Sequence, residues 1–500
     1  MNSAPAPVMH AARSSTAADP RRWLILGTVS LAQLMVVLDA TVVNIALPSA
    51  QRALGFTTVD RQWVVTAYAL AFGSLLLFGG RLGDLIGRKT TFLTGALGFA
   101  AASALGGAAT SFGMLVVARA AQGAFGALLA PAALAILSTT FSDPKERGKA
   151  FGVYGAIVGA GGAIGLVLGG LLTEYLTWRW CLYVNLFFAG LAGAGAVLLL
   201  TNQRARAGTR VDLPGVALVS ASMFSLVYGF SDAANHDWHA PSTYGFLAAG
   251  VALLAVFAFW QARAASPLLP PRLVLDRNRG AAYLAVLITG AGMYGIFLFL
   301  TYYLQQTLGY SPVVSGVAFL PMIATLVIAA NLANVALLPR LGPKPIVVAG
   351  MLLAAGSLVW LTRIGVHSDY APAVLGPLLL VGLGLGFTIA PSMNTGTFGV
   401  APQDAGVASA TLNTGQQVGG SIGTSLLNTI FAGAAAHYLT SHLNPTTLVR
   451  GHAAASLTGL SLIHGYTTAF WVGAAIFAVG AVICGTLFRS GRLTAATTAR

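Results

Sequence analysis

Residues 22–43 read RWLILGTVSLAQLMVVLDATVV, an almost continuous apolar stretch that carries one acid, Asp39. A helix needs about 20 mostly apolar residues to cross the hydrocarbon core of a bilayer. Lipid offers no hydrogen-bond partner to an exposed backbone, so such a stretch is expected to span the membrane as a helix. This segment therefore predicts a membrane-spanning helix with a carboxyl group inside it.

The rest of the 500-residue chain repeats this pattern. Only 8% of its residues are charged, against roughly 25% in ordinary soluble proteins. So few charges cannot coat a soluble body of this size, which argues against soluble enzymes, nucleic-acid-binding proteins and secreted disulfide scaffolds. We predict an all-α polytopic membrane protein with fourteen spans, near residues 22–43, 61–80, 90–109, 113–138, 148–172, 179–201, 213–231, 243–262, 280–304, 312–338, 344–362, 372–396, 406–431 and 465–488.

The basic residues follow the alternation of these spans. If the N-terminus is inside, most of the 27 Lys and Arg residues fall in segments on that side, as cytoplasmic loops require. The connections that collect them are 81–89, 145–149, 204–210, 263–279 and 340–344, whereas Arg52, Arg61, Arg179, Arg363 and Arg450 are assigned to the outside. We therefore expect both termini in the cytoplasm and a place in the cell (plasma or bacterial inner) membrane. The net charge of +14 then indicates contact with anionic lipids rather than with nucleic acid.

Two charged residues lie well inside the expected spans, Asp39 and Arg119. Ionisable groups are costly in a membrane and by default mark an ion or substrate path, although a structural salt bridge between the two helices is the alternative. Burial disfavours the charged form of a carboxylate and a nearby cation favours it. Opening a cavity first to one side of the membrane and then to the other would change both the burial of Asp39 and its distance from the cation. Asp39 could then bind a proton on one side and release it on the other. The expected coupling ion is thus the proton, with no metal or other cofactor.

Glycines recur at four-residue spacing in two of the expected spans. Gly155 and Gly159 form one such pair, and Gly161, Gly165 and Gly169 form a row; the span 406–431 contains Gly415, Gly419 and Gly423. Small residues at this spacing let helices approach closely. The spacing is compatible with fixed packing and with a sliding surface.

Five stretches together resemble the major facilitator superfamily, specifically its 14-helix drug:proton antiporter branch (EmrB/QacA type). They are Leu38–Pro48 (LDATVVNIALP), Gly80–Lys89 (GRLGDLIGRK), Arg119 with Gln122, Gly123 and Gly126, the helix 5 glycines followed by Trp178-Arg179-Trp180 and Asn185, and the region from Tyr303-Leu304-Gln305 to Leu320-Pro321. The resemblance implies that Arg119 takes part in proton coupling together with Asp39. It also implies that the motif built on Gly80, Asp84, Gly87, Arg88 and Lys89 locks the outward-open state.

The resemblance also implies a division of the chain. Residues 1–21 would be a cytoplasmic N-terminus, 22–201 a six-helix bundle, 202–279 two inserted helices, 280–488 a second bundle with a long outside connection at 432–464, and 489–500 a cytoplasmic tail. The connection 339–344 (PRLGPK) looks like a degenerate copy of the Gly80–Lys89 motif, which suits a duplication of two halves.

A transporter of this branch exports hydrophobic or amphipathic compounds such as antibiotics, and we expect it to act as a monomer. Substrate sites of such proteins lie near the midplane between the halves. The polar and aromatic candidates there are Tyr68, Gln122, Tyr294, Tyr302, Asn331, Asn334, Asn394, Asn413 and Gln417. Since no second acid lies deep in the C-terminal half, we predict a neutral, monocationic or zwitterionic substrate.

Other functions share part of this pattern. A dedicated exporter of one endogenous metabolite, lipid or amino acid would carry every motif. A non-transporting receptor would need a sizeable soluble domain, which no cytoplasmic stretch is long enough to form. A membrane-embedded enzyme would need clustered His or acidic ligands inside a span, and none is found in the sequence, so we expect a protein that is not an enzyme.

Overall fold

The computed structural model describes residues 21–57, 60–141, 144–201, 212–236, 238–265, 267–400, 405–442 and 451–492. This part of the chain is helical, and each of the fourteen expected spans overlaps a helix or a run of consecutive helical segments. The N-terminal elements are α1 (Arg22–Leu54), α2 (Gln62–Ile86), α3 (Arg88–Gly107), α4 (Phe112–Thr140), α5 (Pro144–Tyr175) and α6 (Trp180–Leu199), followed by α7 (Leu213–His236), α8 (Pro241–Arg263) and α9 (Pro271–Val274). The remaining elements are α10 (Arg277–Tyr302), η1 (Tyr303–Thr307), α11 (Pro312–Ala318), α12 (Leu320–Leu332), η2 (Ala333–Leu337), α13 (Leu338–Leu341), α14 (Pro343–Leu361), η3 (Ala371–Leu375), α15 (Gly376–Thr397), α16 (Ala405–His442) and α18 (Gly451–Leu487).

Ten of the described helices are long and apolar enough to cross a membrane. Large apolar side chains such as Leu198, Val335 and Val482 are exposed on the outer surface of the bundle. In water these side chains would be unfavourable, whereas lipid tails accommodate them without cost. The protein is therefore a multi-pass membrane protein, as the low charge content predicts.

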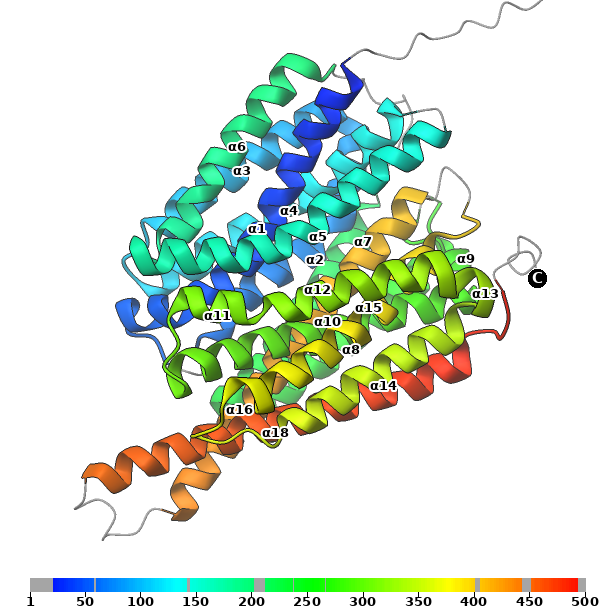
Figure 1. Ribbon diagram of the computed structural model, residues 1–500. Coiled ribbons are helices and arrows are strands. Elements are labelled where there is room, and N and C mark those ends of the chain that lie inside the picture. Colours follow the sequence, from blue (N-terminus) through cyan, green and yellow to red (C-terminus); the bar gives the residue numbers. More distant parts are fainter. Residues whose placement is uncertain are drawn as a thin grey trace, which may run out of the picture.

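The helices form two packed groups, and the same kind of glycine contact holds a helix pair in each. Helices α1 to α6 pack mainly on one another, and α10 to α18 do likewise (Figure 1). In the first group Gly165 lies against Thr41, and in the second Gly419 lies against the Leu287 carbonyl so closely that a Cβ would overlap it. Since α1–α5 and α10–α16 hold corresponding positions in the two groups, these contacts are the packing counterpart of the expected duplication.

The turns that precede α3 and α14 match in the same way. Gly87 has φ 95° and Gly342 has φ 76°, and each is followed directly by the first residue of its helix. Glycine adopts a positive φ without the steric cost that a side chain brings. The expectation that residues 339–344 copy the Gly80–Lys89 turn is therefore supported by backbone conformation.

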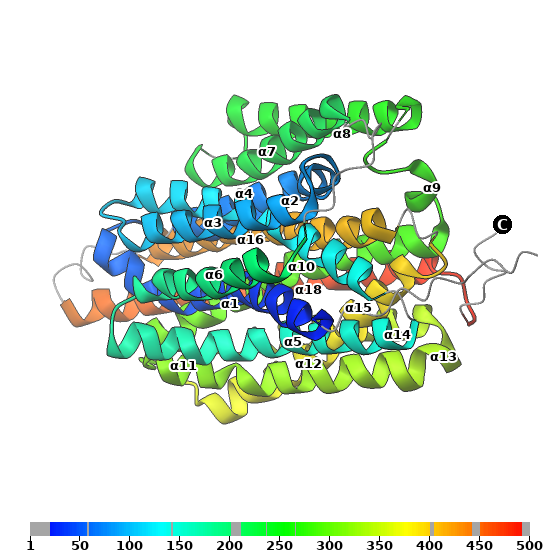
Figure 2. The ribbon, with the colours of Figure 1, turned by 90° about the horizontal axis from the view of Figure 1, so that it is seen from above.

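Helices α7 and α8 form an outer layer on one side of the molecule (Figure 2). Helix α7 lies against both α2 and α16, which belong to different halves. Ser220 Oγ donates to the Ser74 carbonyl of α2 at 3.2 Å, and Thr429 Oγ1 of α16 donates to the Phe230 carbonyl of α7 at 3.0 Å. The inserted pair thus covers the seam where α2 meets α16.

The start of α1 and the end of α18 lie at the same end of the bundle in both views (Figures 1 and 2). We call this end the terminal side and the opposite end the far side. Hydrogen bonds between the halves are found towards the far side. Tyr302 donates to Gln51 at 2.6 Å, and Gln305 Nε2 donates to the Ile45 carbonyl at 3.0 Å. The halves are therefore in direct contact there.

The connection between the last two spans differs from the expected loop at 432–464. Helix α16 continues to His442 and α18 begins at Gly451, and both extend past the other helices at the far side (Figure 1). Tyr438 packs its ring against His442 and His464, which joins the two extensions. The hydropathy pattern fades at the membrane boundary, but the helices do not end there.

Candidate functional site

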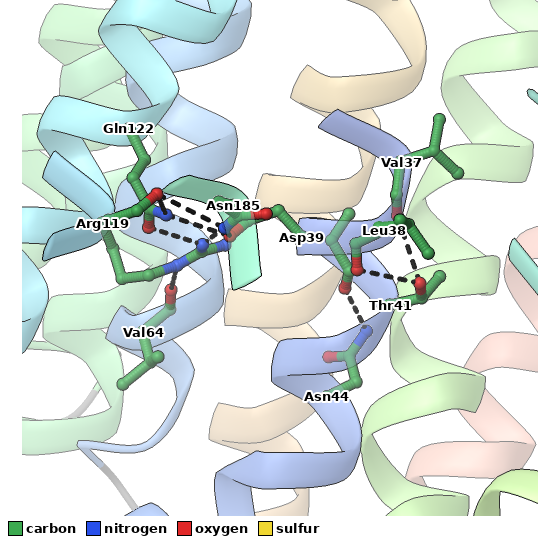
Figure 3. Close-up of polar contacts among 11 residues, drawn as sticks. Val37, Leu38, Asp39, Thr41, Asn44, Val64, Arg119, Gln122 and Asn185 are labelled. Atoms are coloured by element: carbon green, nitrogen blue, oxygen red, sulfur yellow. Dashed lines mark hydrogen bonds and ion pairs between the residues drawn. The ribbon is translucent and has the colours of Figure 1, made fainter. Parts of the chain in front are cut away.

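Asp39 lies at the centre of a fully buried polar cluster (Figure 3). Its Oδ2 accepts a hydrogen bond from Arg119 Nη1 at 2.5 Å. Its Oδ1 accepts from Gln122 Nε2 at 2.9 Å and from Asn185 Nδ2 at 2.7 Å. The expected approach of helix 1 to helix 4 is thus present, and α6 contributes as well. All of these side chains belong to the N-terminal half.

Helix geometry explains how α4 supplies two of the partners. Arg119 and Gln122 are three residues apart, so they project from the same face of the helix, and Arg119 Nη1 also donates to Gln122 Oε1 at 2.8 Å. Gln122 Nε2 further donates to Ser103 Oγ of α3 at 2.7 Å. Buried polar groups are costly unless they are hydrogen-bonded, and donors from α4 and α6 satisfy the carboxylate while Ser103 of α3 supports the two amides.

Arg119 also reaches α2. Its Nε donates to the Val64 carbonyl at 3.0 Å, and its guanidinium carbon lies 4.5 Å from the centroid of the Tyr68 ring. The planar fork of arginine allows one side chain to bind a carboxylate, an amide and a carbonyl at the same time. The ion pair is therefore tied to the first turns of α2.

The cluster around Asp39 is closed to solvent in this conformation. Asp39 is 0% exposed and Arg119 is 2% exposed. Charges interact strongly in such surroundings, so adding a proton to Asp39 would remove the ion pair and leave Arg119 without its counter-charge. Water can reach the carboxyl group only in a different arrangement of the helices.

The expected motif at Gly80–Lys89 is held inside the N-terminal half. Arg88 Nη1 donates to the Ala135 carbonyl and to Thr139 Oγ1 near the end of α4, at 3.1 and 3.0 Å. Lys89 Nζ donates to the carbonyls of Val197 and Leu200 at the end of α6, at 2.9 and 2.7 Å. Cations are favourable at helix C-termini, so the motif fastens three helix ends. Gly80 lies near Pro131 of α4, and the side chain of Asp84 lies outside the described residues.

Most of the expected helix 5 glycines face α1. A Cβ at Gly161 would crowd Leu34, one at Gly165 would overlap Thr41, and one at Gly169 would crowd Val42. Gly155 and Gly159 lie outside the residues whose side-chain positions are described. The neighbouring Gly170 instead lies against Pro312 and Val313 of α11, in the other half. Gly161, Gly165 and Gly169 therefore pack within the N-terminal half, whereas Gly170 lies at the contact between the two halves.

The residues expected to bind substrate do not form one group. Tyr68 and Gln122 belong to the carboxylate cluster, whereas Tyr302 lies at the far side and donates to Gln51. Asn331 and Asn394 are exposed, and Asn334 is partly buried. Asn331 and Asn413 donate to carbonyls of their own helices, and Gln417 lies beside Gly73 of α2. The side chain of Tyr294 is outside the described part of the chain.

Reasoning from the sequence missed two direct partners in the cluster, Ser103 and the Val64 carbonyl. It quoted Asn185 as part of a motif but did not place it on Asp39. Ser103 and Asn185 are both 0% exposed. A polar side chain in the middle of an apolar span was the available signal in each case.

Three charged residues near the ends of spans are more deeply buried than their positions in the sequence suggest. Arg61, assigned to an outside connection, is 1% exposed and packs between the two halves. Asp232 lies about one turn before the end of α7, and it accepts from Ser242 and Thr243 of α8. Asp212 accepts from Gln261 and Trp260 of α8. A hydropathy window ends where a charged residue occurs. Helix α7 instead continues past Asp232, and side chains of α8 donate to Asp212 just before α7 begins.

Fold and site together define a secondary transporter: two helical halves joined at one end, with an ionisable pair buried inside one of them. The profile of the Major Facilitator Superfamily matches residues 29–424, and the chain belongs to that family. Its members are transporters and not enzymes.

Several relatives are named for antibiotic resistance or export. The puromycin resistance protein pur8 of Streptomyces alboniger is 48% identical over 475 residues, covering 94% of this chain and 92% of that protein. The cephamycin export protein CmcT of Amycolatopsis lactamdurans is 39% identical, with 80% and 83% of the two chains covered. The tetracenomycin C resistance and export protein of Streptomyces glaucescens is 35% identical, covering 86% and 79%.

Solved structures share the fold at low sequence identity. A bacterial homologue of the human lysosomal transporter Spinster, in an inward-facing and unoccupied conformation, superposes with a TM-score of 0.61 at 16% identity, covering 93% of this chain and 98% of that one. A peptide transporter of the POT family gives a TM-score of 0.64 at 15% identity, covering 95% and 98%. These likenesses concern the fold alone.

Proposed function

We propose that this protein exports hydrophobic or amphipathic antibiotic-like compounds in exchange for protons by alternating access. The observation that carries the proposal is the fully buried Asp39, which is paired with Arg119 inside an apolar bundle. A purely structural ion pair could be replaced by apolar packing at little cost in stability. A carboxylate that must trade its proton cannot be replaced in that way.

The coupling requires Asp39 to meet water from each side in turn. In the state described above the carboxyl group is sealed and ion-paired. When the far side opens and the surroundings of the cluster change, a proton can enter; when the terminal side opens, it can leave. The binding of substrate would then take the place of the proton in allowing the return movement.

The substrate class rests on the relatives and on the charges of the chain. The relatives named above carry puromycin, cephamycin and tetracenomycin C in their names. Burying an unmatched charge is expensive, and the described part of the C-terminal half has no buried acid. We therefore propose a neutral, monocationic or zwitterionic compound, and puromycin is the first one to test.

The orientation and organisation belong to the same proposal. The terminal side carries Arg22, Arg88, Lys89, Arg277 and Arg492, so we assign it to the cytoplasm, against anionic lipids of the plasma membrane. Residues 22–201 and 280–488 form the moving halves of a monomer, with 202–279 inserted between them. The Gly80–Lys89 motif locks the outward-open state.

A dedicated exporter of one endogenous metabolite, lipid or amino acid is the alternative function. It would use the same proton chemistry, so a compound panel separates the two. Uptake of several unrelated antibiotics into vesicles supports the broad exporter, and transport of a single compound supports the dedicated one. A receptor without transport activity would give no accumulation of any compound.

The test is reconstitution of the full chain in liposomes with an imposed pH gradient, using puromycin and a panel of antibiotics. We expect uphill accumulation that collapses when the gradient is dissipated. The variant Asp39→Asn keeps an oxygen acceptor for Gln122 and Asn185, and it should lose uphill transport but retain exchange of labelled for unlabelled puromycin. Unchanged uphill transport by Asp39→Asn would remove this residue from the mechanism. Asp39-dependent export of a rigid dicationic dye would contradict the substrate class.

A further inference from the structure

Arg61 of the N-terminal half sits in an aromatic cage supplied by the C-terminal half. Its guanidinium carbon lies 4.1 Å from the centroid of Tyr302, 4.7 Å from that of Phe431 and 5.9 Å from that of Phe299. The ring of Tyr466 stacks on Phe431 and interacts electrostatically with Arg61. These aromatic residues come from α10, α16 and α18.

The cage holds the cation without a carboxylate from the described residues. Arg61 Nε donates to Asn428 Oδ1 of α16 at 3.2 Å, and no salt bridge joins Arg61 to an acid in the described ranges. Arginine stacks well on aromatic faces and is less strongly hydrated than lysine. A desolvated cation–π contact is therefore the main attraction that offsets the burial of this charge.

Such a contact is suited to reversible closure. If the halves part at the far side, water can hydrate the guanidinium, and the cage that remains is neutral. A buried ion pair split between the halves would instead leave two unmatched charges at once, at a much larger cost. The cage thus closes the far side firmly and still allows it to open.

The same turn of α2 connects Arg61 to the carboxylate cluster. The Val64 amide donates to the Arg61 carbonyl at 3.3 Å, and the Val64 carbonyl accepts from Arg119 Nε at 3.0 Å. On α2, Arg61 and the Val64 carbonyl that binds Arg119 are therefore about one helical turn apart. A chain of direct contacts therefore runs from Asp39 through Arg119 and Val64 to Arg61 and the other half.

We propose that Arg61 is a positioning residue that ties the charge state of Asp39 to closure of the far side. With Asp39 charged, Arg119 is pinned between the carboxylate and the Val64 carbonyl, and the first turn of α2 holds Arg61 in its cage. Protonation of Asp39, or the binding of substrate beside it, releases Arg119 and lets that turn move. The charged protein does not open the far side unless substrate is bound, so the proton enters after the substrate has left through the open far side. This inference rests on the proposed proton coupling at Asp39.

The groups that face each end of this chain of contacts are few. Among the described residues, Arg119 of α4 and Cys181 of α6 are the titratable or charged groups near Asp39, with Tyr68 of α2 lying on Arg119. The titratable side chains that interact with Arg61 are Tyr302 and Tyr466, and Asp60 precedes it in the chain and accepts from Thr57. Because Asp60 and the far-side histidines can also titrate, the variant Asp39→Asn is what assigns a pH dependence to Asp39.

The test measures the far-side distance between spin labels on the full chain in lipid. Labels are placed through Ala108→Cys and His367→Cys, both exposed positions at the far side, with the buried Cys181 and Cys484 replaced by alanine. In the otherwise unchanged protein we expect one short distance at alkaline pH and a second, longer population at acidic pH. Arg61→Gln should show the longer population at every pH, and Arg61→Lys should be intermediate. Arg52→Gln, which removes an exposed far-side charge, should behave like the parent protein.

Transport gives a second readout, because a merely structural role of Arg61 would lower uphill accumulation and exchange together. In Arg61→Gln, accumulation of puromycin driven by a pH gradient should fall about tenfold, the size of effect expected for losing a desolvated cation–π contact. Exchange of labelled for unlabelled puromycin should persist. If Arg61→Gln does not fold, Phe431→Leu removes part of the cage from the other half and should have the same two effects.

Two outcomes would overturn the inference, and only the second would also overturn the proton role of Asp39. If Arg61→Gln or Phe431→Leu keeps the pH dependence of the parent protein, the role of Arg61 is wrong and Asp39 is unaffected. If the parent protein shows no pH dependence and Asp39→Asn leaves the distances unchanged, the proton role of Asp39 fails together with the inference.

Discussion

Asn185 donates a hydrogen bond to Asp39 at 2.7 Å and so links α6 to α1 across the buried cluster. The same amide nitrogen also lies 3.3 Å from Ser103 Oγ, and the other side-chain atom, Oδ1, has no hydrogen-bond partner among the described residues. A buried acceptor without a partner is unfavourable. The hydrogen bond from the Asn185 amide nitrogen to the Asp39 carboxylate is thus the interaction that offsets the cost of burying this side chain.

Replacing Asn185 with alanine should shift the pH profile of transport to higher pH. The charged carboxylate loses one of its donors, so its protonated form becomes relatively more favourable. A lost hydrogen bond to a charged group predicts a shift of the order of one pH unit. The profile of puromycin exchange in liposomes measures it. Asn44→Ala is the matched control, because Asn44 is a buried amide of the same helix but donates to the Ala40 carbonyl of that helix; an equal shift in both variants would contradict the assignment.

Replacing Arg119 with lysine should uncouple transport although the charge is kept. A lysine ammonium cannot reach the carboxylate, the Gln122 amide and the Val64 carbonyl together, since it lacks the planar fork. Uphill accumulation should fall at least about tenfold, which corresponds to about 1.4 kcal/mol, while the variant still inserts and folds. Uptake driven by a pH gradient, set beside thermal unfolding in detergent, is the measurement. Full uphill transport by the lysine variant would show that only the charge matters.

Replacing Gly419 with alanine should destabilise the C-terminal half. A Cβ there would overlap the Leu287 carbonyl, which is backbone and cannot rotate away. Overpacking of this kind costs about 1–3 kcal/mol. The thermal unfolding temperature in detergent should fall, and Gly162→Ala serves as the control because nothing lies within 4 Å of the added atom. Similar unfolding temperatures for the two variants would mean that α10 and α16 are not so closely packed.

Replacing Lys89 with methionine should weaken the N-terminal half by a smaller amount. The ammonium group donates to two carbonyls at the end of α6, and a cation at a helix C-terminus is worth about 0.3–1 kcal/mol. We expect a modest drop in unfolding temperature that becomes smaller at high salt. Arg363→Gln, an exposed position two residues past α14 whose side chain donates to no carbonyl among the described residues, should cause a smaller change. A loss that does not depend on salt would point to packing of the side-chain stem instead.

The sequence by itself determined the fold class, the number of spans and the pairing of Asp39 with Arg119. Long apolar stretches are local features, and an isolated charge within one of them is costly wherever the helix lies, so neither requires knowledge of the partners. The glycine rows were equally visible, but the faces that they contact were not. Spacing indicates that something approaches closely, and it does not say whether the neighbour belongs to the same half.

Only the tertiary structure decided what surrounds Asp39 and where Arg61 goes. Asn185 is separated from Asp39 by 146 residues, and Asn428 is separated from Arg61 by 367. Burial of Arg61 depends on aromatic side chains from three helices of the other half. By its sequence position it looked like one more charge at the end of a span, because a cation–π cage is made by packing and leaves no local pattern.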